Sequence, residues 1–584
     1  MAGMTSIYVG VSGVQSSQTA LNTTTHNLAN VYTKGYTRQL AFTSDRRYNK
    51  LGNSYTSLMQ VGLGVSSSST SRVRDILLDA QYRKETGRMG FYDAQTEVVS
   101  EIETIVGETE GVKFQDFIEN LWSAVSEMAK TPDSTVTRAE LVMHAETFIH
   151  RAQSIYKELV EYQQNLDTKI KNTVDKINDL GDKINELNLK ISGIEASVES
   201  ANDLRDKRDL YLDELSEYIN ISYVEDENHY VSVKAENVPF VTEGGVFHIE
   251  TAQLDGGKDS IYLSCVWPQL GNQEVFNLEE NINSANNNDI GQLKGFLLAR
   301  GDFIADYTDV PEVADYDVST PEGLKEYMAA VNTYNATVEC SSIEKTQALF
   351  DKLINGIVTS INDIFSPTTS EVPEGVTKYT DAEGNEYIAS EVKILDMTTS
   401  TGDDGKMPPE ELFSRNYTDR FIEVTGDDGN TYYVYNEKNV FGNQSLYTIL
   451  NIDLNQTVRE DYSKLPFRTK EGDKDMQKGK DLVAKWNEKT MNLDPSNMSK
   501  LDFKDFYKQL IYTIGNAGDL YNSIATNQLT TANQIDDTRT QITGVSSEEE
   551  LTNMIKYQSA FNAASRYVTT IADMLEYIIE KLGS

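Results

Sequence analysis

Residues 152–194 read AQSIYKELVEYQQNLDTKIKNTVDKINDLGDKINELNLKISGI. Mostly apolar side chains recur there at alternating spacings of four and three, at Ala152, Tyr156, Leu159, Gln163, Leu166, Ile170, Thr173, Ile177, Leu180, Ile184, Leu187, Ile191 and Ile194. A repeat of 3.5 residues places these side chains in one stripe along a helix. At about 1.5 Å per residue the helix is roughly 63 Å long, and other long helices must cover its stripe. The sequence therefore predicts an elongated helical bundle.

Both ends of the chain carry a stripe of the same kind. The N-terminal stripe comprises Ile7, Val11, Val14, Gln18, Leu21, Thr25 and Leu28. The C-terminal stripe comprises Leu551, Met554, Gln558, Phe561, Ser565, Val568, Ala572, Leu575, Ile579 and Leu582. A single helix cannot bury its own stripe, so we expect both arms to be largely disordered in the monomer and to fold during assembly. Polar residues within the stripes are expected to fix the register between helices.

Between the arms, helix patterns alternate with β patterns. Helices are expected over roughly Val73 to Ile105, Asp289 to Ile304 and Tyr327 to Ile364, and again from Phe503 onward. Runs at Ile219 to Val224 and Tyr230 to Val233 predict strands. The stretch FIEVTGDDGNTYYVY (Phe421 to Tyr435) places Asp-Gly between aromatic and β-branched runs, which predicts a hairpin.

We therefore predict an α+β multidomain fold, an elongated α-helical coiled-coil bundle formed from both chain ends with a mid-chain β-rich insertion. The expected domains are a terminal coiled-coil assembly domain (1–36 and 545–584), an elongated helical-bundle domain (37–221, 290–365 and 500–544), a small β-containing segment (222–289) and a β-rich, surface-exposed insertion domain (366–499).

The net charge of the chain limits which partners are expected. The chain of 584 residues has 52 Lys and Arg against 91 Asp and Glu, a formal charge of −39. Such a surface repels phosphate backbones and anionic lipids, so neither nucleic acid nor a membrane is expected as a partner. The start lacks a basic region followed by a continuous apolar run, and no run approaches the ~20 apolar residues of a membrane span.

Cys265 and Cys340 are expected to be two buried free thiols, with a single disulfide as the alternative.

No pattern of catalytic residues is present. The histidines are His26, His144, His150, His229 and His248, and none stands in a metal-binding spacing. Residues 426–430 (GDDGN) and 381–386 (DAEGNE) are similar to calcium loops but lack the full ligand pattern, so we interpret both as hairpin turns. The chain is therefore expected to be no enzyme and to use no cofactor and no metal.

Both arms resemble bacterial flagellar axial proteins. Asn27-Leu28-Ala29-Asn30, followed by Thr33, Gly35, Tyr36 and Arg38, resembles the N-terminal signature of rod, hook and hook-associated proteins. Gly544-Val545, then Glu550, Asn553, Tyr557-Gln558, Ala560-Phe561 and Ala563, with Met574-Leu575, resembles their C-terminal signature. Gly35 also offers the positive φ that would end the arm.

Within this class the chain resembles the hook-associated protein 1 family. It is longer than rod proteins, and its segment from Asn202 to Asp209 (NDLRDKRD) resembles a segment of that family directly after the long heptad helix. Residues 291–295 (GQLKG) followed by Arg300 resemble the segment that opens the next helix. Residues 366–493 resemble no family that we can name.

The resemblance implies a structural protein of the hook–filament junction. It implies export without a cleaved signal, an extracellular place in the flagellum, and self-assembly into a tubular ring. The implied partners are hook protein, the second junction protein (hook-associated protein 3) and an export chaperone on the C-terminal helix. The implied assembly residues are Ile7, Val11, Val14, Leu21, Leu28, Asn30, Gly35, Tyr36, Leu551, Met554, Gln558, Phe561, Val568, Leu575 and Ile579. Alternatives are another axial protein (hook or flagellin-like) or a flagellum-displayed adhesin that acts through the β-rich insertion.

Overall fold

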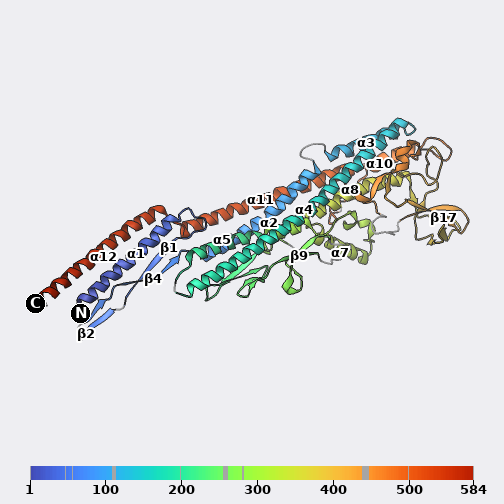
Figure 1. Cartoon of the computed structure of the whole chain (residues 1–584). Coiled ribbons are helices and arrows are strands. Elements are labelled where there is room, and N and C mark those ends of the chain that lie inside the picture. The colour runs from blue at the N-terminus through green and yellow to red at the C-terminus, as the bar shows by residue number, and fades with distance from the viewer. Residues whose placement is uncertain are drawn as a thin grey trace.

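The computed structural model is an elongated rod whose two chain ends lie together at one tip (Figure 1). It describes residues 2–46, 48–54, 57–107, 113–197, 199–253, 261–278, 280, 282–436, 446–497 and 499–582. The strands of residues 366–499 lie near the opposite tip, which confirms the predicted α+β fold with helical ends and a mid-chain β-rich region. No helix within these described ranges combines the length and the apolar character that crossing a membrane requires.

Long helices form the body of the rod. They are α2 (Ile76–Val106), α3 (Phe114–Lys130), α4 (Thr135–Glu195), α5 (Asn202–Tyr218), α6 (Gln292–Arg300), α8 (Ser342–Phe365) and α11 (Phe503–Thr543). The helix predicted over residues 152–194 is confirmed, and at 61 residues α4 is longer because it begins at Thr135. Its predicted stripe is buried from Ala152 to Ile191, while Ile194 at the end is 37% exposed.

An aromatic cluster joins the helices at the distal end of the body. The ring of Phe114 on α3 lies 5.6 Å from that of Phe148 on α4, 5.1 Å from Phe350 on α8 and 5.4 Å from Tyr507 on α11. All four side chains are almost fully buried. One ring therefore contacts helices that are almost 400 residues apart in the chain, as edge-to-face and offset packing of aromatics allows.

Residues 37–75 differ from the expected helical bundle. They form the strands β1 (Gln39–Asp45), β2 (Tyr48–Ser54), β3 (Ser57–Gly62) and β4 (Val65–Arg72). β1 pairs antiparallel with β4, and β2 with β3. The Ser-rich stretch of β4 gives no apolar alternation, so the sequence analysis missed it. A two-stranded ribbon is marginal alone, and this one rests on the N-terminal helix, where the Val65 N–H donates to Ser12 Oγ at 3.1 Å.

The predicted β-containing segment packs against α4. β5 (Ile221–Glu225), β6 (Val231–Ala235), β7 (Val238–Thr242) and β8 (Gly245–Val246) form one antiparallel sheet, and β9 (Glu250–Gln253), β10 (Leu263–Trp267) and β11 (Gln273–Glu274) form another. A Cβ on Gly181 of α4 would lie 2.5 Å from the ring of Phe240, so only glycine allows this close approach of helix and sheet.

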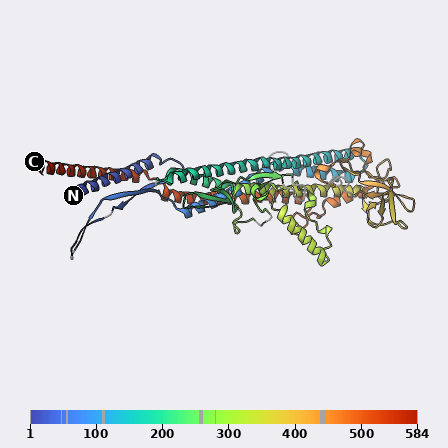
Figure 2. The ribbon, with the colours of Figure 1, turned by 60° about the horizontal axis from the view of Figure 1, so that its bottom comes forward.

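The helix expected over Tyr327 to Ile364 is two helices. α7 (Pro321–Thr337) ends before Val338, and α8 begins after Ser341, whose side chain accepts from the Glu344 N–H. A serine in this position caps a new helix, a signal that the periodicity alone concealed. α7 leans away from the body of the rod (Figure 2).

The distal region contains a six-stranded antiparallel sheet. Its order is β12 (Thr368–Thr369), β15 (Ile394–Leu395), β18 (Thr431–Tyr435), β17 (Phe421–Gly426), β13 (Lys378–Asp381) and β14 (Glu386–Ile388). A second ribbon pairs β16 (Phe413–Arg415) with β19 (Ile452–Leu454). Both Asp-Gly-type turns connect hairpins, as predicted: residues 426–430 join β17 to β18, and 382–385 join β13 to β14.

Not all of residues 366–499 belongs to these sheets. The short helix α9 (Gln456–Glu460) and the helix α10 (Met476–Trp486) lie in the same range. The indole of Trp486 stacks on that of Trp122 of α3, with ring centroids 5.5 Å apart, so α10 packs against the helical body. The domain boundaries drawn from the sequence remain a prediction. The two cysteines are free thiols; Cys265 is buried and Cys340 is half-buried.

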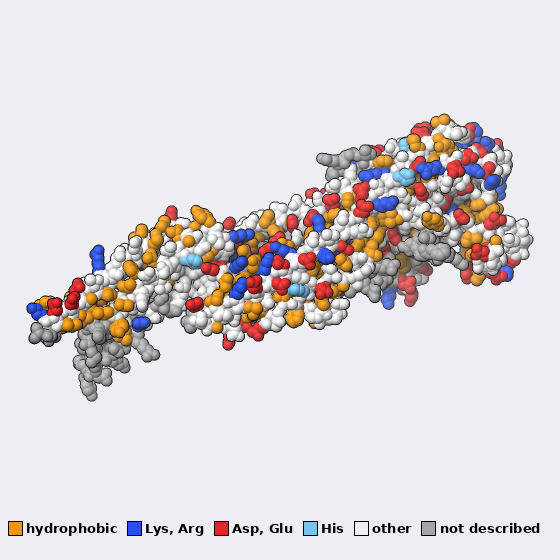
Figure 3. Space-filling model, in the orientation of Figure 1, with side chains coloured by type: hydrophobic (Ala, Val, Ile, Leu, Met, Phe, Trp, Pro, Cys, Tyr) orange, Lys and Arg blue, Asp and Glu red, His pale blue; other side chains and the backbone are white. Residues whose placement is uncertain are grey.

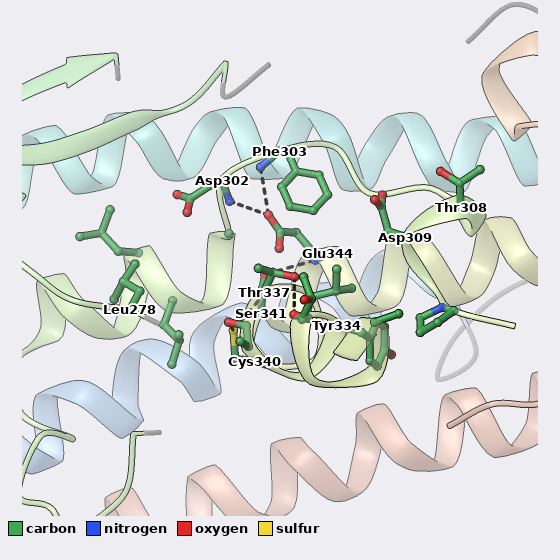
Figure 4. Close-up of a pocket in the computed structure, with 18 of the residues that line it drawn as sticks. Leu278, Asp302, Phe303, Thr308, Asp309, Tyr334, Thr337, Cys340, Ser341 and Glu344 are labelled. Carbon is green, nitrogen blue, oxygen red and sulfur yellow. Dashed lines mark hydrogen bonds between the residues drawn. The ribbon is translucent and has the colours of Figure 1, made fainter. Parts of the chain in front are cut away.

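Side chains of α4 and α8 hold the non-helical segment of residues 301–306, which follows α6, between them. On α8, Glu344 Oε1 accepts from the backbone N–H groups of Asp302 and Phe303, the latter at 2.9 Å (Figure 4). From α4, Gln163 Nε2 donates to the carbonyls of Arg300 and Phe303, both at 2.8 Å. A segment without strand partners therefore satisfies its backbone through side chains. Burial raises the pKa of Glu344 to about 8.

The Glu344 carboxyl should make stability depend on pH. Its folded-state pKa of about 8 lies above the ordinary value of 4.5, so the folded protein keeps a proton that the unfolded chain releases. This contribution is complete below the ordinary pKa and is lost as the pH rises toward 8. Glu344→Gln retains the accepting oxygen but cannot ionise. We expect its unfolding temperature, by calorimetry, to gain a few degrees on the parent between about pH 5 and pH 8.

The exposed Glu326 of α7 supplies the control, since Glu326→Gln removes a carboxylate in water. If Glu344→Gln and the parent follow the same slope of unfolding temperature against pH, Glu344 is ionised in the folded protein and this account is wrong.

Candidate assembly site

The two ends of the chain form an antiparallel helical hairpin. α1 (Ala2–Ala29) and α12 (Ser547–Leu582) lie side by side along their lengths (Figures 1 and 2). A Cβ on Gly10 would lie 2.6 Å from Val568 Cγ2, and a Cβ on Gly13 would lie 3.4 Å from Ala564 Cβ. The glycines that weaken α1 as an isolated helix therefore bring the two helix axes close together.

The face of α1 that is most deeply buried differs from the predicted stripe. Its buried residues are the small or polar Gly10, Ser12, Ala20, Thr24 and Asn27. The predicted positions Ile7, Val11, Val14, Leu21 and Leu28 are half-buried, and Gln18 and Thr25 are exposed. Gly10 is buried where α1 approaches α12 closely, whereas Ser12 is covered by the ribbon at Gly64 and Val65, and Asn27 binds Gln39 of β1. The role of the bulky stripe in assembly stays a prediction.

α12 covers one row of its apolar residues and leaves other apolar side chains exposed, most of them spread over the opposite half of the helix; together these exposed side chains are called the open row. The half-covered row is Met554, Tyr557, Phe561, Ala564, Val568, Ile571 and Leu575. The exposed apolar side chains are Leu551, Ile555, Tyr567, Met574, Tyr577, Ile578 and Ile579, from 43% for Leu551 to 70% for Ile579. Of the predicted residues, Met554, Phe561, Val568 and Leu575 lie in the covered row, while Leu551, Gln558 and Ile579 are exposed.

The structure differs from the expectation that both arms are largely disordered in the monomer, because α1 and α12 are helices that pack on each other along one face. The covered row packs on α1. Tyr567 also touches α1 beside Gly10, while the other side chains of the open row stay largely exposed among the described residues. Apolar side chains are visible along this end of the rod in Figure 3. An exposed apolar strip of this extent on a helix is typical of an interaction surface.

The residues after α1 form a tight exit from the helix. The Asn30 side chain donates to the His26 carbonyl at 3.0 Å, and Gly35 adopts the positive φ of 77° that the sequence predicted. The Tyr36 hydroxyl donates to Asn27 Oδ1 at 2.8 Å. Burial, together with nearby Asp203 and Asp206, raises the pKa of Tyr36, so the hydroxyl keeps the proton that it donates.

Asn27 connects both helices of the hairpin to β1. Its Nδ2 donates to the Gln39 carbonyl at 2.9 Å and to Glu550 Oε2 at 3.2 Å. Its Oδ1 accepts from the Gln39 N–H at 3.0 Å and from Tyr36. A buried amide with every donor and acceptor used is a specific joint, because any other arrangement would leave polar groups unpaired. The sequence analysis included Asn27 and Glu550 in two separate signatures but did not join them.

The third motif, at residues 202–209, contacts the segment next to the residues that Asn27 binds. Asp206 accepts from the Thr37 N–H at 2.9 Å, from Thr37 Oγ1 at 2.6 Å and from Arg72 at 2.7 Å. Asp209 lies among Arg72, Arg74 and Arg83, which lower its pKa against the effect of burial. The clustering of acids in NDLRDKRD is the signal that could have identified this site from the sequence.

A separate cleft of about 610 Å³ lies between α7, α8 and residues 301–311 (Figure 4). Its lining includes Cys340, Glu344 and Asp302. Burial raises the pKa of the Cys340 thiol to about 12, so the thiol is protonated near neutral pH and is a poor nucleophile. Among the residues that the structure describes, no group of three or more His, Cys, Asp or Glu side chains is placed to hold a metal ion.

Family models match three parts of the chain. Residues 99–366 match the flagellar hook-associated protein FlgK helical domain. Residues 538–581 match the flagellar basal body rod FlgEFG protein C-terminal model, and residues 7–37 match the flagella basal body rod protein model. The last two matches fall on α12 and α1, the helices that form the hairpin.

Curated relatives align along almost the whole chain. Flagellar hook-associated protein 1 of Bacillus subtilis (strain 168) is 24% identical over 603 residues, covering 99% of each chain. The proteins of the same name from Salmonella typhimurium and Escherichia coli (strain K12) are 21% and 22% identical over 97% of this chain and 98% of theirs. The flagellar hook junction protein FlgK from Burkholderia pseudomallei covers 80% of this chain at 12% identity with a TM-score of 0.48.

The closeness of Gly13 and Ala564 gives a direct test of the hairpin. With Cys265 and Cys340 replaced by serine, Gly13→Cys with Ala564→Cys should oxidise to an intramolecular disulfide in the monomer, because 3.4 Å between the Cβ positions is within reach of a disulfide. Gel mobility with and without reductant measures it. The pair Gln15→Cys with Ala564→Cys is the control, since Gln15 points into solvent. Equal cross-linking of both pairs would mean that the arms are unstructured.

Proposed function

The chain belongs to the family of flagellar hook-associated protein 1, and from this premise we propose how it serves as a structural subunit of the hook–filament junction of the bacterial flagellum. The subunits polymerise through the hairpin of α1 and α12 at the distal end of the hook and so provide the base on which the filament assembles. The observation that carries this proposal is the open apolar row of α12, which leaves an unfinished surface at the tip where both termini meet.

Assembly would bury this row against neighbouring copies. Transferring one largely exposed isoleucine, such as Ile555 or Ile579, into an apolar contact contributes about 1.5–3 kcal/mol. Several such residues repeat along α12, so a modest contact by each subunit adds up around a ring. A contact between different patches on successive subunits continues head to tail and generates rings or helical tubes. The residues implied by the family signatures, from Ile7 to Tyr36 and from Leu551 to Ile579, are proposed to lie in this contact.

The partners follow from the place in the flagellum. The chain associates with other axial components of the flagellum. We propose hook protein on one side of the layer, the second junction protein (hook-associated protein 3) on the other, and an export chaperone on α12 before assembly. We also propose that the chain reaches the cell exterior without a cleaved signal peptide, and that it has no enzymatic activity. The similarity to flagellar structural proteins supports the last proposal.

Removal of the gene from its host tests the junction role. Electron microscopy of such cells should show hooks without filaments, and flagellin should accumulate in the medium. Restoring the gene should restore the filaments. Cells that keep their filaments after the deletion would reject the role.

Deletion of residues 545–584 should leave a folded body that is exported poorly or not incorporated. The body keeps its own apolar clusters, to which the described residues of α12 do not contribute, so its thermal transition should change little. Circular dichroism measures folding, and immunogold labelling of flagella measures incorporation. A truncated chain that enters flagella normally would show that α12 is not needed for assembly.

The open row can be tested without loss of the helix. Ile555→Asp places a charge on a side chain that is 65% exposed in the monomer. The unfolding temperature of the monomer should stay within a few degrees of the parent, while incorporation into flagella should fall at least about tenfold, as expected for the loss of ~1.4 kcal/mol or more per contact. Ile555→Leu is the matched control and should assemble. Normal incorporation of Ile555→Asp would exclude this row from the contact.

A further inference from the structure

The hairpin of α1 and α12 is joined to the body mainly by polar contacts. None of the described residues of these two helices belongs to the apolar clusters of the body. From α1 the chain runs through residues 30–38 into the ribbon of β1–β4 that packs on α1, enters the body at residues 73–75, and returns to the hairpin at Gly544–Ser546. Apolar packing tolerates small rotations, whereas hydrogen bonds depend on direction. The angle between hairpin and body is therefore set by the polar groups at the junction.

Two buried carboxylates hold residues 37–39 from opposite sides. Asp206, on α5 of the body, accepts three hydrogen bonds, two of them from Thr37. Glu550, in the first turn of α12, accepts from Arg38 Nε at 2.8 Å and from Asn27 at 3.2 Å. Their exposed fractions are 5% and 1%. In addition, the Arg38 N–H donates to the carbonyl of Thr543, the last residue of α11, at 2.7 Å.

We propose that Asp206 and Glu550 are positioning residues that lock the orientation of the terminal hairpin relative to the body, and that this lock sets the angle at which neighbouring copies meet. The second half of this statement rests on the proposed function; the first half does not. Both carboxylates hold the short segment of residues 37–39 through which α1 leaves the hairpin, so the lock fails if either of them loses its partners. Glu550 lies on α12 and Asp206 lies on α5. Residues 37–39, which bind both carboxylates, therefore fix the positions of α1 and α12 relative to the body.

A cleft beside the lock gives the hairpin room to move. It has a volume of about 580 Å³ and lies between the base of the hairpin (Gly35, Gly544 and Val545) and the body (Leu210 and Glu217). A solidly packed junction would hold the hairpin by steric contact alone. With open space on one side, steric contact does not fix the hairpin from that side, and its orientation depends on the directional bonds of the lock.

The matched control lies seven residues further along the same helix. Asp213 of α5 is also a largely buried carboxylate, and it pairs with Arg83 at 2.6 Å and with Arg539 at 2.7 Å. Both of these arginines belong to the body. Asp213→Asn therefore removes a similar charge and similar ion pairs from α5 without touching the hairpin.

Distances between spin labels in the full-length monomer test the lock. With Cys265 and Cys340 replaced by serine, nitroxides are attached at Ser559→Cys on α12 and Ser523→Cys on α11, both exposed. We expect one narrow distance distribution in the parent and in Asp213→Asn. Asp206→Asn and Glu550→Gln should broaden the distribution at least about twofold or add a second distance. An unchanged distribution in either variant would overturn the lock as stated.

Two further measurements separate the possible failures. Should Asp206→Asn not fold, Arg38→Gln breaks the Glu550 contact from a half-exposed side chain and must give the same broadening. The variants are then assayed in host cells for incorporation into flagella. If the distances broaden but incorporation stays normal, the link from orientation to assembly is overturned while the lock stands. If the distances broaden and incorporation falls while Asp213→Asn is incorporated normally, both parts are supported.

Discussion

The structure depends on one constraint, which is that the apolar stripe of α4 must be removed from water along its whole length. That stripe runs through most of a helix of 61 residues. Sheets and loops could cover only part of it, so α2, α3, α5 and α8 lie along it, and α11 packs on α2 and α8. The rod shape follows from this packing. The hairpin at one tip and the sheets at the other are placed by the ends of helices whose length the stripe requires.

Polar groups inside this packing decide details that apolar burial leaves open. Gln163 occupies a position of the otherwise mostly apolar stripe of α4, and its side chain donates to the carbonyls of Arg300 and Phe303. Glu344 accepts from two backbone N–H groups from the side of α8. Each buried polar group costs free energy when its partner is missing, so only one register of the segment between the helices is acceptable. The same principle operates at Asn27, Asp206 and Glu550, where three distant parts of the chain meet.

In the terminal hairpin, one face of α12 is buried against α1, while other apolar side chains of α12 are exposed to solvent. Glycines and small residues of α1 allow a close approach to Val568 and Ala564, which buries one face within the monomer. The remaining apolar side chains of α12 stay in water, as Ile555 and Ile579 show. If α12 buried all its apolar side chains within the chain, no apolar surface would remain to drive its association with other copies. If α12 buried none of them, its exposed apolar surface would favour non-specific association.

The sequence by itself determined the long helix, the amphipathic ends, the hairpin turns at residues 426–430 and 382–385, and the family, because periodicity, turn residues and short signatures are local properties of the chain. It did not determine the ribbon of β1 and β4, because the Ser-rich strand β4 carries no apolar alternation and the ribbon is held by α1. It also did not determine which face of α1 meets α12, because that choice depends on how closely two helices approach, and Gly10 reveals this only beside Val568. The joint of Asn27, Asp206 and Glu550 was equally out of reach: its members are separated by up to 523 positions, and only tertiary packing brings their polar groups within hydrogen-bonding distance.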